Sequence, residues 1–250
     1  MNATAAQAPA AGRANIEVVK ISDYIGAEIR NVDLQNQTPE LHEALKVALA
    51  ENGVIFMRNQ TITPEQHAQL AYGFGDPFDR TDPKTATHGM SFMGTVSKTE
   101  DQHDNIGNAW HIDQTYQQKP PNATILVARE LPERGGDTLF ADQHLAWETL
   151  SPELQQRILP LKAEHSYLAK YEELRAKNPW RPKLSQAQVD QVAPAVQPVV
   201  RTHPETGRKA LFVSEHFTTR IVGLPQAEGD ALLAELLRHE LLAGILGEPL

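Results

Sequence analysis

The segment Trp110-His111-Ile112-Asp113 places an imidazole and a carboxylate two residues apart. Along an extended strand successive side chains point to opposite faces, so we expect His111 and Asp113 to point to the same side. Together they supply two of the three ligands of a 2-His-1-carboxylate facial triad, which holds non-haem Fe(II) and keeps one face of the metal open. The spacing alone also has an ordinary interpretation, a solvated histidine and aspartate on a strand edge.

The segments that follow this pair make the metal interpretation more specific. A Pro120-Pro121 pair comes next, then a strand-like run from Ala123 to Ala128, and then Gly135-Gly136-Asp137-Thr138. The double glycine on its own is only a turn signal. It is the ordered combination behind His-x-Asp that points to one type of protein.

The ordered segments resemble the taurine dioxygenase family of Fe(II)/2-oxoglutarate-dependent oxygenases, over residues 16–240. This resemblance implies a mostly β chain with flanking helices (α+β), folded as a double-stranded β-helix of the jelly-roll, cupin-like kind. It also implies Fe(II) as cofactor, with 2-oxoglutarate and O2 as cosubstrates. The segments that carry the resemblance are Trp110–Tyr116, Pro120-Pro121, Glu130-Leu131-Pro132, Gly135–Phe140, Ala163–His165, Val199–Pro204 and Leu211–Arg220.

The resemblance implies catalytic and cofactor roles for three residues. His111 and Asp113 become the iron ligands, and Thr138 donates its hydroxyl to the distal carboxylate of 2-oxoglutarate. For Thr138 the alternative is a β-branched residue that simply packs in a strand.

Substrate contacts are implied for Arg80, Tyr116, Tyr171 and Phe217. Family members that act on sulfonates carry a histidine where this chain has Arg80. An arginine there still binds an anion through two hydrogen bonds. For the three aromatic residues ordinary core packing stays open. The histidines expected at the surface are His42, His88, His103 and His144.

One part of the family pattern has no counterpart in this chain. The family's third metal ligand is a distal histidine, followed by an arginine that pairs with 2-oxoglutarate, and no Trp-Asp-Asn-Arg-like segment follows Arg220. The predicted helix ending at His239 runs directly into Leu241–Gly247, which is similar to the family's closing strand. Either the natural chain carries a further segment near residue 240, or the protein truly lacks it. Among the remaining histidines, His216 is the one considered as a substitute ligand.

The composition limits the other classes of function. A net charge of −9 argues against a nucleic-acid or membrane-binding surface, so an anionic substrate needs a local cationic group. Cysteine is absent, which excludes disulfides and thiolate metal sites. The sequence has neither an apolar run of ~18 residues nor the pattern of a signal peptide, so a cytoplasmic protein is expected.

A length of 250 residues suits one domain, and we expect a flexible tail over 1–14 and a single domain over 15–250 that misses a segment near 240. Helices are predicted to begin at Thr38-Pro39, Thr63-Pro64 and Ser151-Pro152, where a capping residue precedes proline. The other predicted elements are strands at 16–20 and 54–57, a loop at 98–108, an irregular insertion with helical pieces at 170–194, a hairpin of 199–200 and 211–213 around a turn at 204–207, and a last helix over 226–239.

Three functions compete. The leading hypothesis is a 2-oxoglutarate-dependent dioxygenase that hydroxylates a small anionic organic acid of the sulfonate, sulfate ester or aryloxyacid type. The second is a catalytically impaired or non-catalytic binding protein on the same fold, because the distal histidine and arginine are absent. The third, metal-assisted hydrolysis on a cupin-like barrel, leaves the segment from Gly135 to Thr138 without a role. Assembly into a homo-oligomer stays open.

Overall fold

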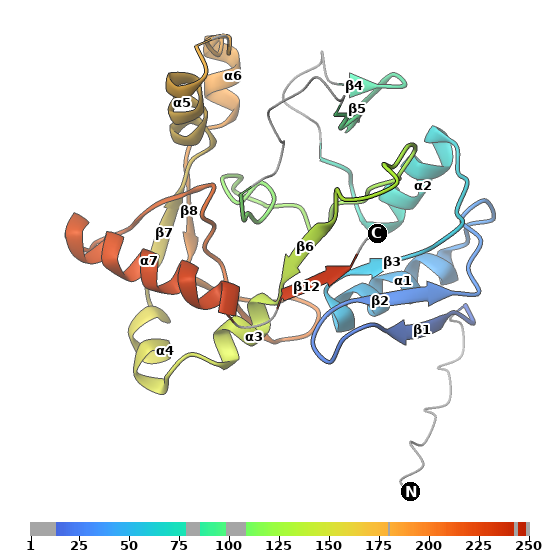
Figure 1. Ribbon diagram of the computed structural model, residues 1–250, viewed down its shortest axis with the longest axis horizontal. Coiled ribbons are helices and arrows are strands. Elements are labelled where there is room, and N and C mark those ends of the chain that lie inside the picture. Colours follow the sequence, from blue (N-terminus) through green and yellow to red (C-terminus); the bar gives the residue numbers. More distant parts are fainter. Residues whose placement is uncertain (1–13, 79–85, 99–108, 180, 243–244, 249–250) are drawn as a thin grey trace, which may run out of the picture. The chain divides into compact units, whose positions relative to one another are not determined.

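The computed structural model describes residues 14–78, 86–98, 109–179, 181–242 and 245–248 (Figure 1). Predictions for the tail before residue 14, for Arg80, for His103 and for most of the 98–108 loop lie outside these residues. Contacts within the chain form two compact units. The first comprises residues 1–77, 125–138 and 248–250, and the second comprises 78–124 and 139–247.

The first unit combines a three-stranded sheet with two helices. Strand β1 (Glu17–Lys20) pairs antiparallel with β2 (Ala27–Arg30), which pairs parallel with the short β3 (Ile55–Phe56). The strand predicted at 16–20 is therefore confirmed, whereas the one at 54–57 is shorter and only half-buried. The sheet packs with helices α1 (Pro39–Asn52) and α2 (Pro64–Phe74) around one apolar core.

Both helices of this unit begin where the capping signals predicted. The Thr38 hydroxyl accepts a hydrogen bond from the Leu41 amide, and proline occupies the first turn of α1. Thr63 and Gln66 form a complete capping box at α2. The core contains Ile29, Leu34, Leu41, Leu45, Ala48, Ile62 and Leu70.

The sequence predicted a strand over Ala123–Ala128, and this prediction is wrong. The run pairs with no strand among the described residues. Its side chains still alternate between half-buried and exposed, as in an extended chain. Ile125 and Val127 pack on the first core, and the Arg129 guanidinium donates to the Ile62 carbonyl at 2.7 Å. Apolar alternation thus marked an extended segment, whereas a strand also needs a partner.

The second unit contains the sheet β11-β7-β8, whose strands are all antiparallel. β7 (Lys162–His165) lies between β11 (Thr218–Ile221) and β8 (Ala195–Pro198). The hairpin of β9 (Val200–Thr202) and β10 (Lys209–Leu211) confirms the predicted turn, where Gly207 has a φ of 70°. A further hairpin consists of β4 (Ala86–Thr87) and β5 (Met90–Gly94).

Five helices are described in the second unit. α3 (Gln143–Glu148) packs against β10 and against α7 (Gln226–Leu242), and α7 also packs against β11. α4 (Pro152–Ile158) begins at the predicted Ser151 cap. The helical pieces predicted between 170 and 194 are confirmed as α5 (Tyr167–Lys177) and α6 (Gln186–Gln191), which lie beyond one end of β7 and β8 in Figure 1.

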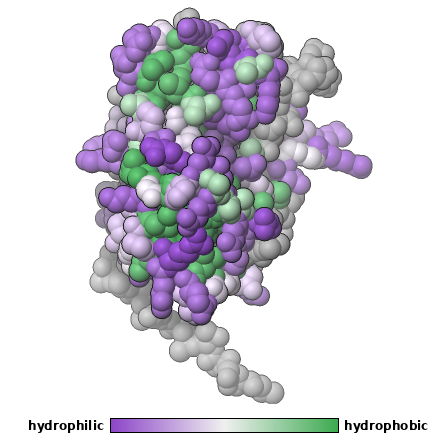
Figure 2. Space-filling view, turned by 90° about the vertical axis from the view of Figure 1, so that its left-hand side faces the viewer, coloured by the Kyte–Doolittle hydropathy of each residue, from purple (hydrophilic) through white to green (hydrophobic). Residues whose placement is uncertain are grey.

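The core of this unit contains Leu232 and Leu236 of α7, both almost fully buried, together with Ile158, Val199, Leu211 and Val213. Figure 2, which views the chain from the side of α7, shows mostly hydrophilic side chains with hydrophobic ones in smaller patches. None of the described helices is long and apolar enough to span a membrane.

The described residues therefore combine helices with several small sheets, and helices hold more of them than strands do. The sequence predicted a larger share of strand than this. The tail after α7 does form the expected strand, since β12 (Ile245–Glu248) pairs with β6 (Thr138–Ala141).

Candidate metal and substrate site

His111 and Asp113 converge in the second unit, although they do not lie on a strand. The Nε2 atom of His111 is 3.3 Å from Oδ1 of Asp113. The backbone is irregular up to Ile112 and enters a turn at Asp113, in which Gln114 has a left-handed φ of 52° and its carbonyl accepts from the Gln117 amide. The prediction that both side chains face one side is confirmed, and the predicted strand is wrong because the chain turns immediately after Asp113.

Neighbouring groups orient both side chains. His111 Nδ1 lies 2.8 Å from the Ala109 carbonyl, which can only accept, so Nδ1 carries the proton of this hydrogen bond. In a neutral imidazole Nε2 then carries the lone pair that can bind a metal. The Thr124 hydroxyl donates to Oδ2 of Asp113 at 2.5 Å, which leaves Oδ1 facing His111. Such outer partners orient the ligands of metal sites.

The charge states of the pair are coupled. The hydrogen bond that His111 donates to the Asp113 carboxylate raises the pKa of His111 above its ordinary value, because the carboxylate stabilises the imidazolium. The same contact, with help from Thr124, lowers the pKa of Asp113. Asp113 is therefore anionic at neutral pH and provides the negative charge that a divalent cation needs.

Two donors of this kind fit a metal ion of the Fe(II) class, because imidazole nitrogen and carboxylate oxygen both suit it. Within the part of the chain that the structure describes, no third histidine or carboxylate joins them at coordinating distance. The geometry thus supports half of a facial triad directly.

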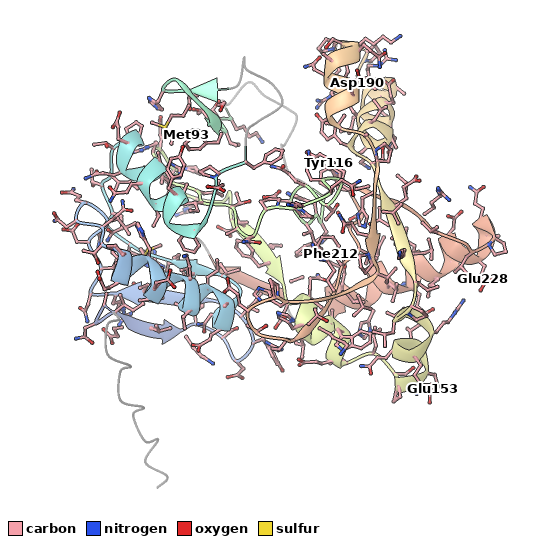
Figure 3. The ribbon with its side chains drawn as sticks, turned by 180° about the vertical axis from the view of Figure 1, so that it is seen from behind. Met93, Tyr116, Glu153, Asp190, Phe212 and Glu228 are labelled. Carbon is pink, nitrogen blue, oxygen red and sulfur yellow. The ribbon has the colours of Figure 1, made fainter. Side chains whose placement is uncertain are left out.

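Aromatic side chains surround one side of the pair. The Phe217 ring lies edge-on to His111 at 6.4 Å and to Tyr116 at 5.0 Å between centroids. Tyr116 contacts Tyr167 at 5.3 Å, which in turn stacks on Tyr171 at 5.8 Å. The structure thus brings the three predicted aromatic residues into one cluster near His111, and Figure 3 labels Tyr116 of this cluster.

The sequence reasoning missed Tyr167, which links the cluster. It lies directly after the Ser166 cap and four residues before Tyr171, so both rings lie on one face of α5. That spacing was the available signal. Tyr171 is nearly buried, and its hydroxyl donates to the Pro182 carbonyl at 2.7 Å, so packing accounts for part of its role.

His216 lies in the same cluster. Its ring centroid is 6.1 Å from that of His111 and 4.7 Å from that of Phe217. Its Nδ1 atom is buried and has no hydrogen-bond partner.

A fully buried histidine, His165, is the last residue of β7, the strand that pairs with β11. Burial lowers its pKa to about 4, so the ring is neutral at physiological pH. The Thr218 hydroxyl lies 3.2 Å from its Nδ1, while its Nε2 has no partner. The only sequence signal for this residue was its place in Ala163–His165.

Thr138 is the exposed first residue of β6 and belongs to the first unit, whereas His111 belongs to the second. Gly135 and Gly136 just before it have φ angles of 75° and 81°, as the turn signal predicted. Arg80 lies outside the described residues.

The histidines expected at the surface have different environments. His88 is exposed, as predicted. His42 and His144 are half-buried, and their rings form hydrogen bonds to the Gln37 side chain at 2.9 Å and to the Lys209 carbonyl at 2.9 Å.

Comparisons with known proteins support the metal interpretation. The chain is 32% identical over 252 residues to an α-ketoglutarate-dependent sulfate ester dioxygenase of Pseudomonas putida. The aligned region covers 95% of this chain and 78% of that protein. The chain is 30% identical over 230 residues to an α-ketoglutarate-dependent 2,4-dichlorophenoxyacetate dioxygenase of Cupriavidus pinatubonensis, which covers 85% and 78%.

The fold has solved counterparts as well. A taurine dioxygenase from Burkholderia xenovorans superposes with a TM-score of 0.78 at 29% identity, covering 95% of this chain and 77% of that one. The model of the family described as taurine catabolism dioxygenase TauD, TfdA matches residues 17–241. Because this match spans most of the chain and includes His111 and Asp113, the protein belongs to the TauD/TfdA family of dioxygenases.

Proposed function

We propose that the protein is an Fe(II)- and 2-oxoglutarate-dependent dioxygenase that hydroxylates a small anionic organic acid of the sulfonate, sulfate ester or aryloxyacid type. The observation that carries this proposal is the convergence of His111 Nε2 and Asp113 Oδ1 at 3.3 Å, in a chain of this family. The related proteins named above act on a sulfate ester and on an aryloxyacid, which supports the substrate class. We further propose that the sheets belong to a double-stranded β-helix.

The residues of the site have separate tasks in this proposal. His111 and Asp113 hold the metal, and the Ala109 carbonyl and the Thr124 hydroxyl fix their orientation. Bound iron supplies the redox chemistry with O2 and 2-oxoglutarate, which side chains alone do not provide. Phe217 and Tyr116 cover one side of the ligands with apolar surface and exclude water there.

An anionic substrate needs a cationic partner, since the whole chain carries a net charge of −9. We propose Arg80 for this task and the rings of Tyr116, Tyr171 and Phe217 for the rest of the substrate. The cytoplasmic location, and the absence of nucleic-acid and membrane partners, stay predictions.

Oxygen consumption tests the function. The purified chain with Fe(II), 2-oxoglutarate and a panel of sulfonates, sulfate esters and aryloxyacids should consume O2 only when 2-oxoglutarate is present, and succinate should form in step. A hydrolase would convert its substrate without O2. Metal binding with no O2 uptake for any substrate would favour the non-catalytic binding protein.

Thr138 offers a test of cosubstrate binding. Thr138→Val keeps the shape and removes the hydroxyl, so a bound carboxylate loses a charge-assisted hydrogen bond that contributes roughly 1.5–3 kcal/mol. The apparent affinity for 2-oxoglutarate should then fall about ten- to a hundred-fold. Thr138→Ser, which keeps the hydroxyl, is the control and should bind nearly as the parent does. Equal affinity in the valine variant would leave Thr138 with a packing role alone.

Without the family's distal histidine, the 250 residues lack the expected third metal ligand, and without the distal arginine they lack a partner for 2-oxoglutarate. We propose that a natural form with a further segment near residue 240 carries both residues between Arg238 and Leu241. The intact mass of the natural protein tests this, because such a segment adds several kilodaltons to the mass of the 250 residues. A mass equal to that of the 250 residues would show that the segment is absent, so that a third donor, where the protein has one, comes from another part of this chain.

A further inference from the structure

We propose that His216 supplies the third protein donor to the metal in the 250-residue chain. This inference rests on the proposed function and concerns the same site. It assigns the ligand to the turn between β10 and β11 rather than to a segment after α7. The family match includes His216 but ends at residue 241, before the chain finishes.

The distance between the rings is the first support. The centroids of His111 and His216 are 6.1 Å apart, with planes at 55°. With metal–nitrogen bonds of about 2.1 Å, two imidazoles on adjacent positions of one ion have centroids roughly 4.5–5.3 Å apart. His216 therefore has to approach by roughly 1 Å, which rotation about its side-chain bonds provides.

The second support is the unsatisfied nitrogen of His216. Its Nδ1 is buried and has no hydrogen-bond partner, although the great majority of buried polar atoms have one. An unpaired ring nitrogen is a cost to the metal-free protein, and a metal ion would remove it. Asp113 already contributes the negative charge that attracts a cation to this side of the cluster.

The third support is the way in which the turn of residues 214–217 is held. The Ser214 amide donates to the Thr218 hydroxyl at 2.8 Å, and the Thr218 amide donates to the Ser214 carbonyl at 2.9 Å. The Phe217 carbonyl accepts from the Ser166 amide at 2.8 Å. The backbone beside His216 is therefore fixed against β7 and α5, so only the side chain has to move.

His165, which is fully buried in the same unit, is a weaker candidate. His165 also has a nitrogen without a partner, but its ring packs against Phe212 at 5.8 Å and is completely buried. No ring contact between His165 and His111 occurs among the described residues, whereas His216 contacts His111 directly.

Metal titration of the full chain tests this assignment. Co(II), used alone as a stable substitute for Fe(II), is titrated into the parent, His216→Ala and His216→Phe, and binding is followed by calorimetry and by visible absorption. The phenylalanine variant keeps a ring among the aromatic neighbours but has no donor atom. His144→Ala is the matched control, because His144 forms another imidazole pair with His203 at 5.9 Å.

We expect both His216 variants to bind Co(II) at least ten-fold more weakly than the parent and to change its absorption spectrum, while His144→Ala binds as the parent does. Unchanged affinity in His216→Phe, with an unchanged melting temperature, would overturn the assignment of His216. If the parent itself binds no Co(II), or if His111→Ala binds as well as the parent, the proposed function fails instead. The two failures are thereby distinguishable.

Discussion

His111→Ala and Asp113→Ala should each abolish tight Fe(II) binding and reduce 2-oxoglutarate-dependent O2 uptake to background, with little change in stability. Each variant removes one of the two donor atoms that converge at 3.3 Å. Loss of an outer partner alone typically costs ten- to a hundred-fold in metal affinity, so loss of a ligand should cost at least ~100-fold. Stability should hold because the two side chains are 35% and 46% exposed, so truncation leaves no core cavity.

Anaerobic calorimetry with Fe(II) and thermal melts of the metal-free proteins measure these effects. Thr124→Val provides a graded control, because it removes only the hydroxyl that donates to Asp113 Oδ2 and should cost about ten- to a hundred-fold. An exposed histidine outside the cluster, His88, provides the neutral control as His88→Ala. Iron binding by His111→Ala as tight as in the parent would show that the metal lies elsewhere.

The predictions from local signals were the most successful for helix starts. Thr38-Pro39, Thr63-Pro64 and Ser151-Pro152 each cap a helix in the structure, because a hydroxyl and a following proline satisfy the first turn within four residues of chain. The 204–207 turn was equally local. Strands are different, because a ladder requires a second segment that the local pattern does not identify, and Ala123–Ala128 therefore remained unpaired.

The site was predicted through motifs, and only in part through geometry. His111 and Asp113 converge as expected, but a turn at Gln114 brings this about and not the alternation of a strand. Thr124, which orients Asp113, lies eleven residues away along the chain, and its contact depends on the path of the intervening loop. Sequence spacing carries no information on such a contact.

Glu240, in α7, shows another limit of the sequence patterns. It follows Leu232 and Leu236 at intervals of four, so the helical period places it on the buried face of α7. Glu240 is only 4% exposed, and its Oε2 has no hydrogen-bond partner. Burial, with a smaller contribution from the charge of Glu215, raises the pKa of Glu240 to about 8.

This raised pKa predicts that the protein loses stability as pH rises from about 4.5 through 8. In the unfolded chain Glu240 ionises near its ordinary pKa, whereas the folded chain keeps the proton, so the unfolded state binds fewer protons between these values. The stability that protonated Glu240 contributes, relative to its ionised form, is fully present below pH 4.5 and is lost as pH rises through 8. Each pKa unit corresponds to 1.36 kcal/mol, so the whole interval sets an upper bound of about 5 kcal/mol.

Glu240→Gln keeps the shape and removes the titration, so the parent and the variant should have similar stability at pH 4.5 and should differ increasingly at higher pH. We expect the variant to melt several degrees higher at pH 8, because 1 kcal/mol corresponds to roughly 2–4 °C in a chain of this size.

Glu235→Gln, at an exposed position of the same helix, should show no such dependence. Glu215→Gln should make the parent's loss of stability slightly smaller and end it at slightly lower pH, because burial is the main cause of the raised pKa of Glu240 and the charge of Glu215 adds to it. A difference between Glu240→Gln and the parent that is constant with pH would show that the Glu240 carboxyl does not titrate in this range, and that burial alone does not keep it protonated.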